Sequence, residues 1–150
     1  MGYSTIEDIA CENNIESAFK SAKDWLNKNA VGIIRGYSPK VSYINLVDEI
    51  EYKIDTKTDR AMCMPNYFNP IIVVNLKKIK ESYQKHLSKN NHGPEIDITS
   101  MFVYEITKYI VTKDIETSLA YSLYKTPHQI GREVENINRV RRGLKPFPGF

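Results

Sequence analysis

Val103-Tyr104-Glu105-Ile106-Thr107-Lys108 lies in the most strongly helical stretch of this sequence, and it decides the fold that we expect. Asp97 can cap the free amides at the start of a helix that covers residues 97–112. The apolar side chains of this helix recur at helical spacing and cover a wide arc: Ile98, Met101, Phe102, Ile106, Tyr109 and Ile110. An arc of this width needs neighbours on several sides. We therefore expect this helix to lie at the centre of the protein.

A second helix, over residues 127–143, has clear residues for its start and its end. Thr126 and Gln129 form a capping box, and Pro127 suits the first turn because it has no amide to leave unpaired. Gly143 can adopt the left-handed conformation that ends many helices. The helical spacing predicts a buried apolar face made of Ile130, Val134, Ile137 and Leu144.

The rest of the chain predicts one more long helix and a small sheet. A capping box at Ser4 and Glu7 begins a helix over residues 4–29. The run Ile71–Val74 is β-branched throughout, which predicts a strand buried on both faces, within a sheet around residues 30–76. At 150 residues the chain is long enough for one core. We expect an α+β fold, in which a small β-sheet packs against several helices in a single domain over 1–150.

Composition and charge exclude few classes of function. The 21 basic and 18 acidic residues give a net charge of +3, which is too balanced to indicate a nucleic-acid protein. Basic residues do gather in the C-terminal helix, so nucleic acid stays the alternative partner there. No apolar run is long enough to span a membrane, and no signal peptide is visible. The two cysteines, Cys11 and Cys63, fit a reducing compartment, and we expect a cytoplasmic protein.

Residues 104–108 have the spacing of a zinc-peptidase helix. Such helices carry two histidines one turn apart, which bind one zinc ion, and a glutamate beside the first histidine, which activates the metal-bound water. Here Glu105 occupies the glutamate position, while Tyr104 and Lys108 occupy the histidine positions. Spacing carries Glu105 onto or beside the apolar face. We therefore expect Glu105 to be buried and paired, with Lys108 or, by preference, Arg139.

The predicted helix over residues 127–143 has a sequence that is consistent with this zinc-peptidase spacing. It contains Glu135-Asn136, then Arg139, then Gly143-Leu144, before a short tail that ends at Phe150. In this order the chain resembles the small zincin-like peptidase domains of bacterial effectors, polymorphic toxins and phage proteins. The resemblance covers about residues 95–150 and implies a zincin-like core. It also implies that His128 stands where such domains often have a further acidic ligand, and a histidine can bind metal as well.

The two missing histidines determine what the resemblance implies about function. Lysine rarely binds metal, and one glutamate with one histidine does not make a catalytic zinc site. We therefore expect no metal, no cofactor and no proteolysis, but a pseudoenzyme that binds another macromolecule, chiefly a protein. It would act in the cytoplasm or after delivery into a host cell. The residues predicted for a remnant pocket are Tyr104, Glu105, Lys108 and His128, and those predicted for binding are Glu135, Asn136, Arg139 and Arg142.

An active enzyme of another class is the alternative. ADP-ribosyltransferases that resemble the cholera-toxin type use an arginine on an early strand, a Ser-Thr-Ser strand and a late Glu-x-Glu. The matching residues are Arg35, the pair Thr99-Ser100, and Glu133 with Glu135. The sequence predicts helices around the last two motifs, whereas that chemistry needs strands or a loop beside the NAD cleft.

Overall fold

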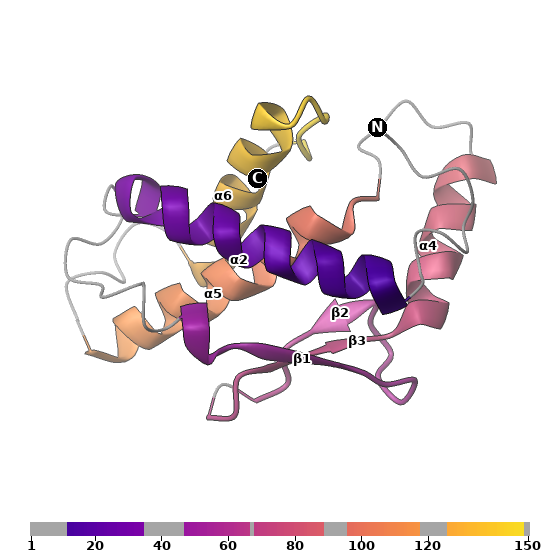
Figure 1. Cartoon of the computed structure of the whole chain (residues 1–150), viewed down its shortest axis with the longest axis horizontal. Helices are drawn as coiled ribbons and strands as arrows, with labels where there is room; N and C mark the ends of the chain where they lie inside the picture. The colour runs from indigo at the N-terminus through magenta and orange to yellow at the C-terminus, as the bar shows by residue number, and fades with distance from the viewer. Residues whose placement is uncertain (1–11, 35–46, 67, 89–95, 118–125, 149–150) are drawn as a thin grey trace.

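The computed structural model describes residues 12–34, 47–66, 68–88, 96–117 and 126–148, with only the main chain at 12–13, 30–34, 86–88 and 114–117 (Figure 1). In these ranges the chain has a small α+β fold, as predicted. The helices are α2 (Glu12–Ile34), α4 (Leu76–Ser88), α5 (Ile98–Thr117) and α6 (Pro127–Arg141). The strands are β1 (Glu51–Ile54), β2 (Met62–Cys63) and β3 (Ile71–Val74).

The sheet has β3 at its centre, in the order β1-β3-β2. β1 runs parallel to β3 with Glu51 opposite Ile71, whereas β2 runs antiparallel with Met62 opposite Val74. Ile72, Val73 and Val74 are buried, which confirms that this β-branched run is covered on both faces. Asn75 follows β3 directly, and its side-chain oxygen accepts a hydrogen bond from the Lys78 amide (3.2 Å) at the start of α4.

The first helix is longer at its C-terminal end than the sequence predicted. The sheet was expected to begin near residue 30, but the main chain of 30–34 continues α2, so that part of the prediction is wrong. Extending an existing helix adds one hydrogen bond per residue without a new nucleus, which outweighs the weak strand preference of Val31, Ile33 and Ile34. The Ser4 capping box and Arg35 lie outside the described residues. The described sheet therefore begins at Glu51 and not near residue 30.

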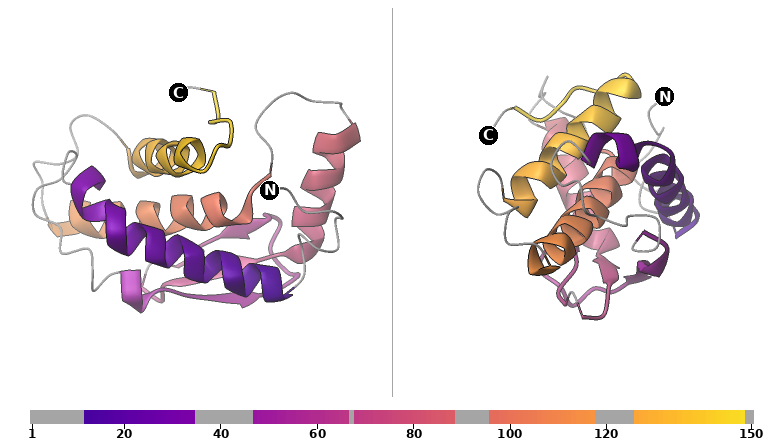
Figure 2. Two further views of the ribbon diagram at one scale, coloured as in Figure 1. Left: turned by 45° about the horizontal axis from the view of Figure 1, so that its top comes forward. Right: turned by 90° about the vertical axis from the view of Figure 1, so that its left-hand side faces the viewer.

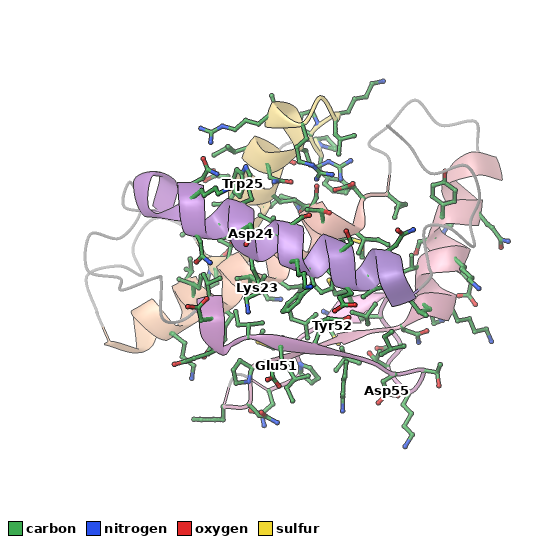
Figure 3. The ribbon with its side chains drawn as sticks, in the orientation of Figure 1. Lys23, Asp24, Trp25, Glu51, Tyr52 and Asp55 are labelled. Atoms are coloured by element: carbon green, nitrogen blue, oxygen red, sulfur yellow. The ribbon has the colours of Figure 1, made fainter. Side chains whose placement is uncertain are left out.

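The core forms where α2, α5 and the sheet meet. The rings of Phe19 on α2 and Tyr52 on β1 lie 4.8 Å apart, and Phe102 on α5 lies 5.1 Å from Phe19 and 5.9 Å from Tyr52. Figure 3 shows Tyr52 between β1 and α2, while Trp25 lies on the side of α2 toward α6. The Arg141 guanidinium lies 6.0 Å from the centre of the Trp25 ring, which links α2 to α6.

α5 is the central helix, as its wide apolar arc predicted. It lies between the sheet and α6 (Figure 2), and its most extensive contacts are with α6 and then with α2. Phe102, Ile106 and Ile110 on this helix are fully buried. α5 ends at Thr117, five residues beyond the predicted end. α5 is therefore the helix against which α6 packs.

α6 begins as the sequence predicted and ends at Arg141, two residues before the predicted bound, with Gly143 in the predicted left-handed conformation. The Thr126 hydroxyl accepts a hydrogen bond from the Gln129 amide, and the Gln129 side chain accepts one from the Thr126 amide. Gly143 has a φ of 78°. Its amide donates to the Val140 carbonyl and the Leu144 amide donates to the Arg139 carbonyl, which together form a Schellman ending.

Candidate binding pocket between α5 and α6

The face of α6 that packs on α5 is partly polar, which the sequence did not predict. Ile130 and Val134 are buried as expected, but Ile137 and Leu144 are only half-buried. In their place the buried residues of α6 include Glu135, Asn138 and Arg139, each with no exposed surface. The helix is rotated relative to the predicted apolar stripe because α5 offers polar partners as well as apolar ones. The part of the prediction that placed Ile137 and Leu144 in the core is wrong.

A cavity of about 230 Å³ lies between these helices. Its walls include Met62 from β2, Met101 from α5 and Phe147 from the C-terminal tail. Its polar lining consists of Asp97, Tyr104, Glu105, Arg132, Glu135 and Arg139. The cavity therefore combines apolar walls with three acids, two arginines and a phenol.

Glu135 is a buried carboxyl in the lining of this cavity, and only one of its two oxygens has a hydrogen-bond partner among the described residues. Its Oε1 atom accepts a hydrogen bond from Arg132, while its buried Oε2 atom has no hydrogen-bond partner among the described residues. Burial raises the pKa of the Glu135 carboxyl to about 7, although the charges of Arg132 and Arg139 act in the opposite direction. A group with this pKa can hold or release a proton near neutral pH.

Glu105 lies on the α5 side of the same cavity and is only 4% exposed, which confirms its predicted burial. Its Oε1 atom lies 3.6 Å from the Lys108 Nζ atom, so Lys108 is its partner. Arg139 was the preferred partner in the sequence prediction, but Arg139 acts on the charge of Glu135 instead, one turn along α6. Burial raises the pKa of Glu105, and the charge of Lys108 offsets part of that shift.

The four residues predicted for a remnant pocket come together around the Tyr104 ring. The Tyr104 hydroxyl shares a hydrogen bond with His128 Nδ1, and the two rings meet edge to face at 5.5 Å. Lys108 Nζ lies 5.3 Å and the Arg132 guanidinium 4.5 Å from the centre of the Tyr104 ring. Burial and both of these charges lower the pKa of His128, which favours its neutral form. Only Tyr104 and Glu105 line the cavity itself.

Close packing at Gly131 allows Tyr104 to take this position. A methyl group added at Gly131 would lie 3.1 Å from the Tyr104 ring and 3.2 Å from the Tyr104 carbonyl oxygen. The glycine thus permits the main chains of α5 and α6 to approach closely beside the pocket.

Gly131→Ala is expected to destabilise the protein by about 1–3 kcal/mol, because the added methyl group would overpack the helix contact. In an exposed helix the same change would stabilise by about 1 kcal/mol. The free energy of unfolding from urea denaturation distinguishes the two signs. A stabilised Gly131→Ala variant would show that α5 and α6 are not in close contact here.

Arg142, one of the predicted binding residues, binds the capping residue at the N-terminal end of α5. Its guanidinium donates two hydrogen bonds to Asp97, at 2.7 and 3.1 Å, and a further one to the Asn138 side-chain oxygen at 3.0 Å. Burial would raise the pKa of Asp97, but the hydrogen bonds and charge of Arg142, together with Ser100, lower it overall. Asp97 also accepts from the Ser100 amide at 2.9 Å, which confirms its predicted role as the cap of this helix.

The other predicted binding residues divide between the cavity and the C-terminal tail. Glu135 and Arg139 are buried, so they line the cavity and do not form an exposed basic surface. Asn136 holds the tail: its amide donates to the Phe147 carbonyl at 3.2 Å, and its oxygen accepts from the Phe147 amide at 2.9 Å. Asn136 thus hydrogen-bonds to the backbone of a neighbouring segment.

The described residues of the ADP-ribosyltransferase alternative lie in helices, which do not suit NAD chemistry of that type. Glu133 and Glu135 lie within α6, and Thr99 and Ser100 lie in the first turn of α5. Neither pair has the strand or loop setting which that chemistry needs. Among the described residues, no group of three or more His, Cys, Asp and Glu side chains is arranged to hold a metal ion.

Two larger hollows lie elsewhere on the protein, and they are less enclosed by buried side chains. One lies between α2 and β1, where Lys23, Asp24 and Tyr52 line it (Figure 3). The other lies beside the turn between β1 and β2, around Asp55, Thr58 and Cys63. Most of their charged side chains are exposed, whereas the lining of the α5–α6 cavity includes buried charges.

Comparison with other proteins does not place this chain in a family: no family model, no curated protein and no solved structure matches it. Within the described ranges, no helix is both long enough and apolar enough to cross a membrane. A function can therefore be inferred only from the arrangement of the side chains.

The sequence predicted no site role for six of the residues that line the cavity: Met62, Ile96, Asp97, Met101, Arg132 and Phe147. Met62 comes from β2, and its approach to α5 depends on the packing of the sheet. Arg132 and Phe147 were visible as part of a basic helix and an aromatic tail, but nothing in the sequence indicated that they meet. The one available hint was the spacing of Arg132 and Glu135, which suits an ion pair within a helix.

Proposed function

We propose that this chain is a zincin-like protein of the effector or phage type that has lost its catalytic zinc and binds another macromolecule through the α5–α6 cavity. The observation that carries this proposal is the contact between Tyr104 and His128. Tyr104 stands in the position of the first histidine ligand, and His128 stands where a further ligand is often found. Two positions that the resemblance assigns to one metal site are thus in contact in space.

The remaining side chains explain why binding is favoured over peptide hydrolysis. Lys108, at the second histidine position, is paired with Glu105, so the glutamate that would activate water is held by a cation. Ligand pockets usually have volumes of about 300–1,000 Å³. The cavity of about 230 Å³ is smaller. It suits one side chain of a partner protein better than a large substrate.

The zincin-like part of the proposal predicts a gain of metal binding. The wild-type protein should contain no stoichiometric zinc, whereas the variant Tyr104→His/Lys108→His should take up zinc, because both ligands of the helix are restored next to His128. Elemental analysis of the purified proteins measures the zinc content. Adding His128→Ala to the double variant should weaken zinc binding, and a cooperative thermal transition would show that each variant is folded.

Two results would contradict this prediction. Stoichiometric zinc in the wild-type protein, lost in His128→Ala, would show that the native chain is a metal-binding protein. A folded double variant that takes up no zinc would contradict the zincin-like part of the proposal, but not the part that makes the cavity a binding site.

The binding part of the proposal is tested separately with peptides. Selection of displayed random peptides on the wild-type protein should yield a consensus sequence, and Met101→Trp should abolish binding because the larger ring fills the cavity. Lys28→Trp adds the same side chain at an exposed position of α2 and serves as the matched control. Selected peptides that bind Met101→Trp unchanged, or that the zinc-free protein cleaves, would overturn it.

A further inference from the structure

The C-terminal tail is bound to α6 in the manner of a peptide ligand. Residues 144–148 form no helix or strand, yet their main chain is held at two successive points. The Arg139 Nε atom donates to the Lys145 carbonyl at 2.7 Å. Asn136 then both donates to and accepts from the main chain of Phe147. A side-chain amide that pairs with both polar groups of one residue recognises an extended main chain independently of its sequence.

The Phe147 side chain supplies the selective part of this contact. The guanidinium groups of Arg132 and Arg139 each lie 4.6 Å from the centre of its ring. Two cations at this distance favour an aromatic ring over an aliphatic side chain of similar volume. The ring also forms part of the cavity wall, beside Tyr104 and Glu135. We call Arg132, Asn136 and Arg139 the tail clamp.

The prolines around Phe147 suit this mode of recognition. Pro146 and Pro148 carry no amide hydrogen, so Phe147 has the only main-chain donor between them, and Asn136 accepts it. Proline also restricts the chain before binding, which lowers the entropy lost on ordering. In a Pro-aromatic-Pro segment, Asn136 therefore pairs with both main-chain polar groups of the aromatic residue.

We infer that the tail clamp is a peptide-binding site, occupied in cis by residues 145–148, and that its partner is a protein segment with an aromatic residue between prolines. The inference rests on the proposed function, because it names the chemistry of the macromolecule that is bound. The partner's ring would replace Phe147 at the cavity wall. The chain's own tail thus acts as an autoinhibitory competitor, and binding requires its displacement.

The test uses the whole chain of residues 1–150 and a labelled peptide with the sequence of residues 144–148, acetyl-Leu-Lys-Pro-Phe-Pro-amide. In the variant Phe147→Ala the competing ring is absent while Asn136 and both arginines remain. This variant should bind the peptide at least about tenfold more tightly than the wild-type protein, as measured by fluorescence anisotropy. Phe147→Leu, which retains an apolar side chain at the cavity wall, serves as a second variant if Phe147→Ala does not fold.

Two matched controls distinguish specific recognition by the tail clamp from non-specific peptide binding. A peptide with cyclohexylalanine in place of phenylalanine has a similar apolar volume without a π face, and it should bind about tenfold more weakly. Adding Asn136→Ala to the Phe147 variant should weaken binding to a similar extent. In the wild-type protein, the side-chain amide resonances of Asn136 should shift when peptide is added.

Three outcomes would overturn the inference. The first is a folded Phe147 variant that shows no binding at about 1 mM peptide. The second is equal affinity for the phenylalanine and cyclohexylalanine peptides. The third is dimerisation of the wild-type chain that the peptide does not disrupt, which would assign the clamp to a second copy. Each of these leaves the zinc-uptake and Met101→Trp tests of the proposed function unaffected.

Discussion

Replacing Arg139 by methionine is expected to lower the free energy of unfolding by about 3–5 kcal/mol, the usual cost of removing one member of a buried charge pair. Arg139 is among the largest fully buried side chains of the protein. Its charge offsets that of Glu135, its Nε atom holds the Lys145 carbonyl, and its guanidinium covers the Phe147 ring. Methionine retains much of the length of the side chain but none of these polar interactions.

Urea denaturation at pH 8, where Glu135 is ionised, measures this loss. The matched control is Arg141→Met on the same helix, because Arg141 is exposed and its hydrogen bond to Asn29 lies at the surface. That control should change the stability by about 0.5 kcal/mol or less. If both variants lose the same amount, the burial of Arg139 and the polar face of α6 would both be in doubt.

Glu135→Gln is expected to change the pH dependence of stability by roughly 3 kcal/mol between pH 4.5 and 7. The pKa of Glu135 is raised from 4.5 to about 7 in the folded protein. Between these values the folded chain keeps a proton that the unfolded chain has lost, so this group makes the wild-type protein less stable as the pH rises. Glutamine cannot ionise, and the variant therefore gains stability relative to wild type across this window.

The measurement compares urea midpoints of the two proteins at several pH values from 4.5 to 8.5. Other titrating groups, including Glu105 and Asp97, contribute to both proteins and largely cancel in the difference. A difference that stays constant over this range would show that Glu135 is either solvated or fully paired. The double variant Arg139→Met/Glu135→Gln should be more stable than the sum of the two single changes in free energy predicts, since the two side chains interact within one network.

The sequence predicted the roles of the charged residues in the cavity only in part. The pattern around Glu105 predicted its burial and offered Lys108 as one partner, because helical spacing fixes which neighbours lie one turn apart. The pattern could not decide between Lys108 and Arg139, since that choice depends on the rotation of α6 against α5. The same rotation moved Ile137 toward the surface and brought Arg139 inside.

The end of α2 shows a similar limit in the prediction of secondary structure. Strand-forming residues after Asn29 suggested a strand, but continuation of a helix that already exists is cheaper than starting a new element. Local preferences of this kind are weak, and the context of the chain overrides them.

The sequence by itself determined the features that depend on neighbours within a few residues. These are the strand at Ile71–Val74, the central helix begun by Asp97, and the capping box at Thr126 with the left-handed end at Gly143. Only the tertiary structure decided which side chains share the α5–α6 cavity. Arg132, Glu135 and Phe147 meet Met62 and Tyr104 there because the sheet, two helices and the tail converge from distant parts of the chain. Periodicity along one helix carries no information about the angle at which another helix packs against it.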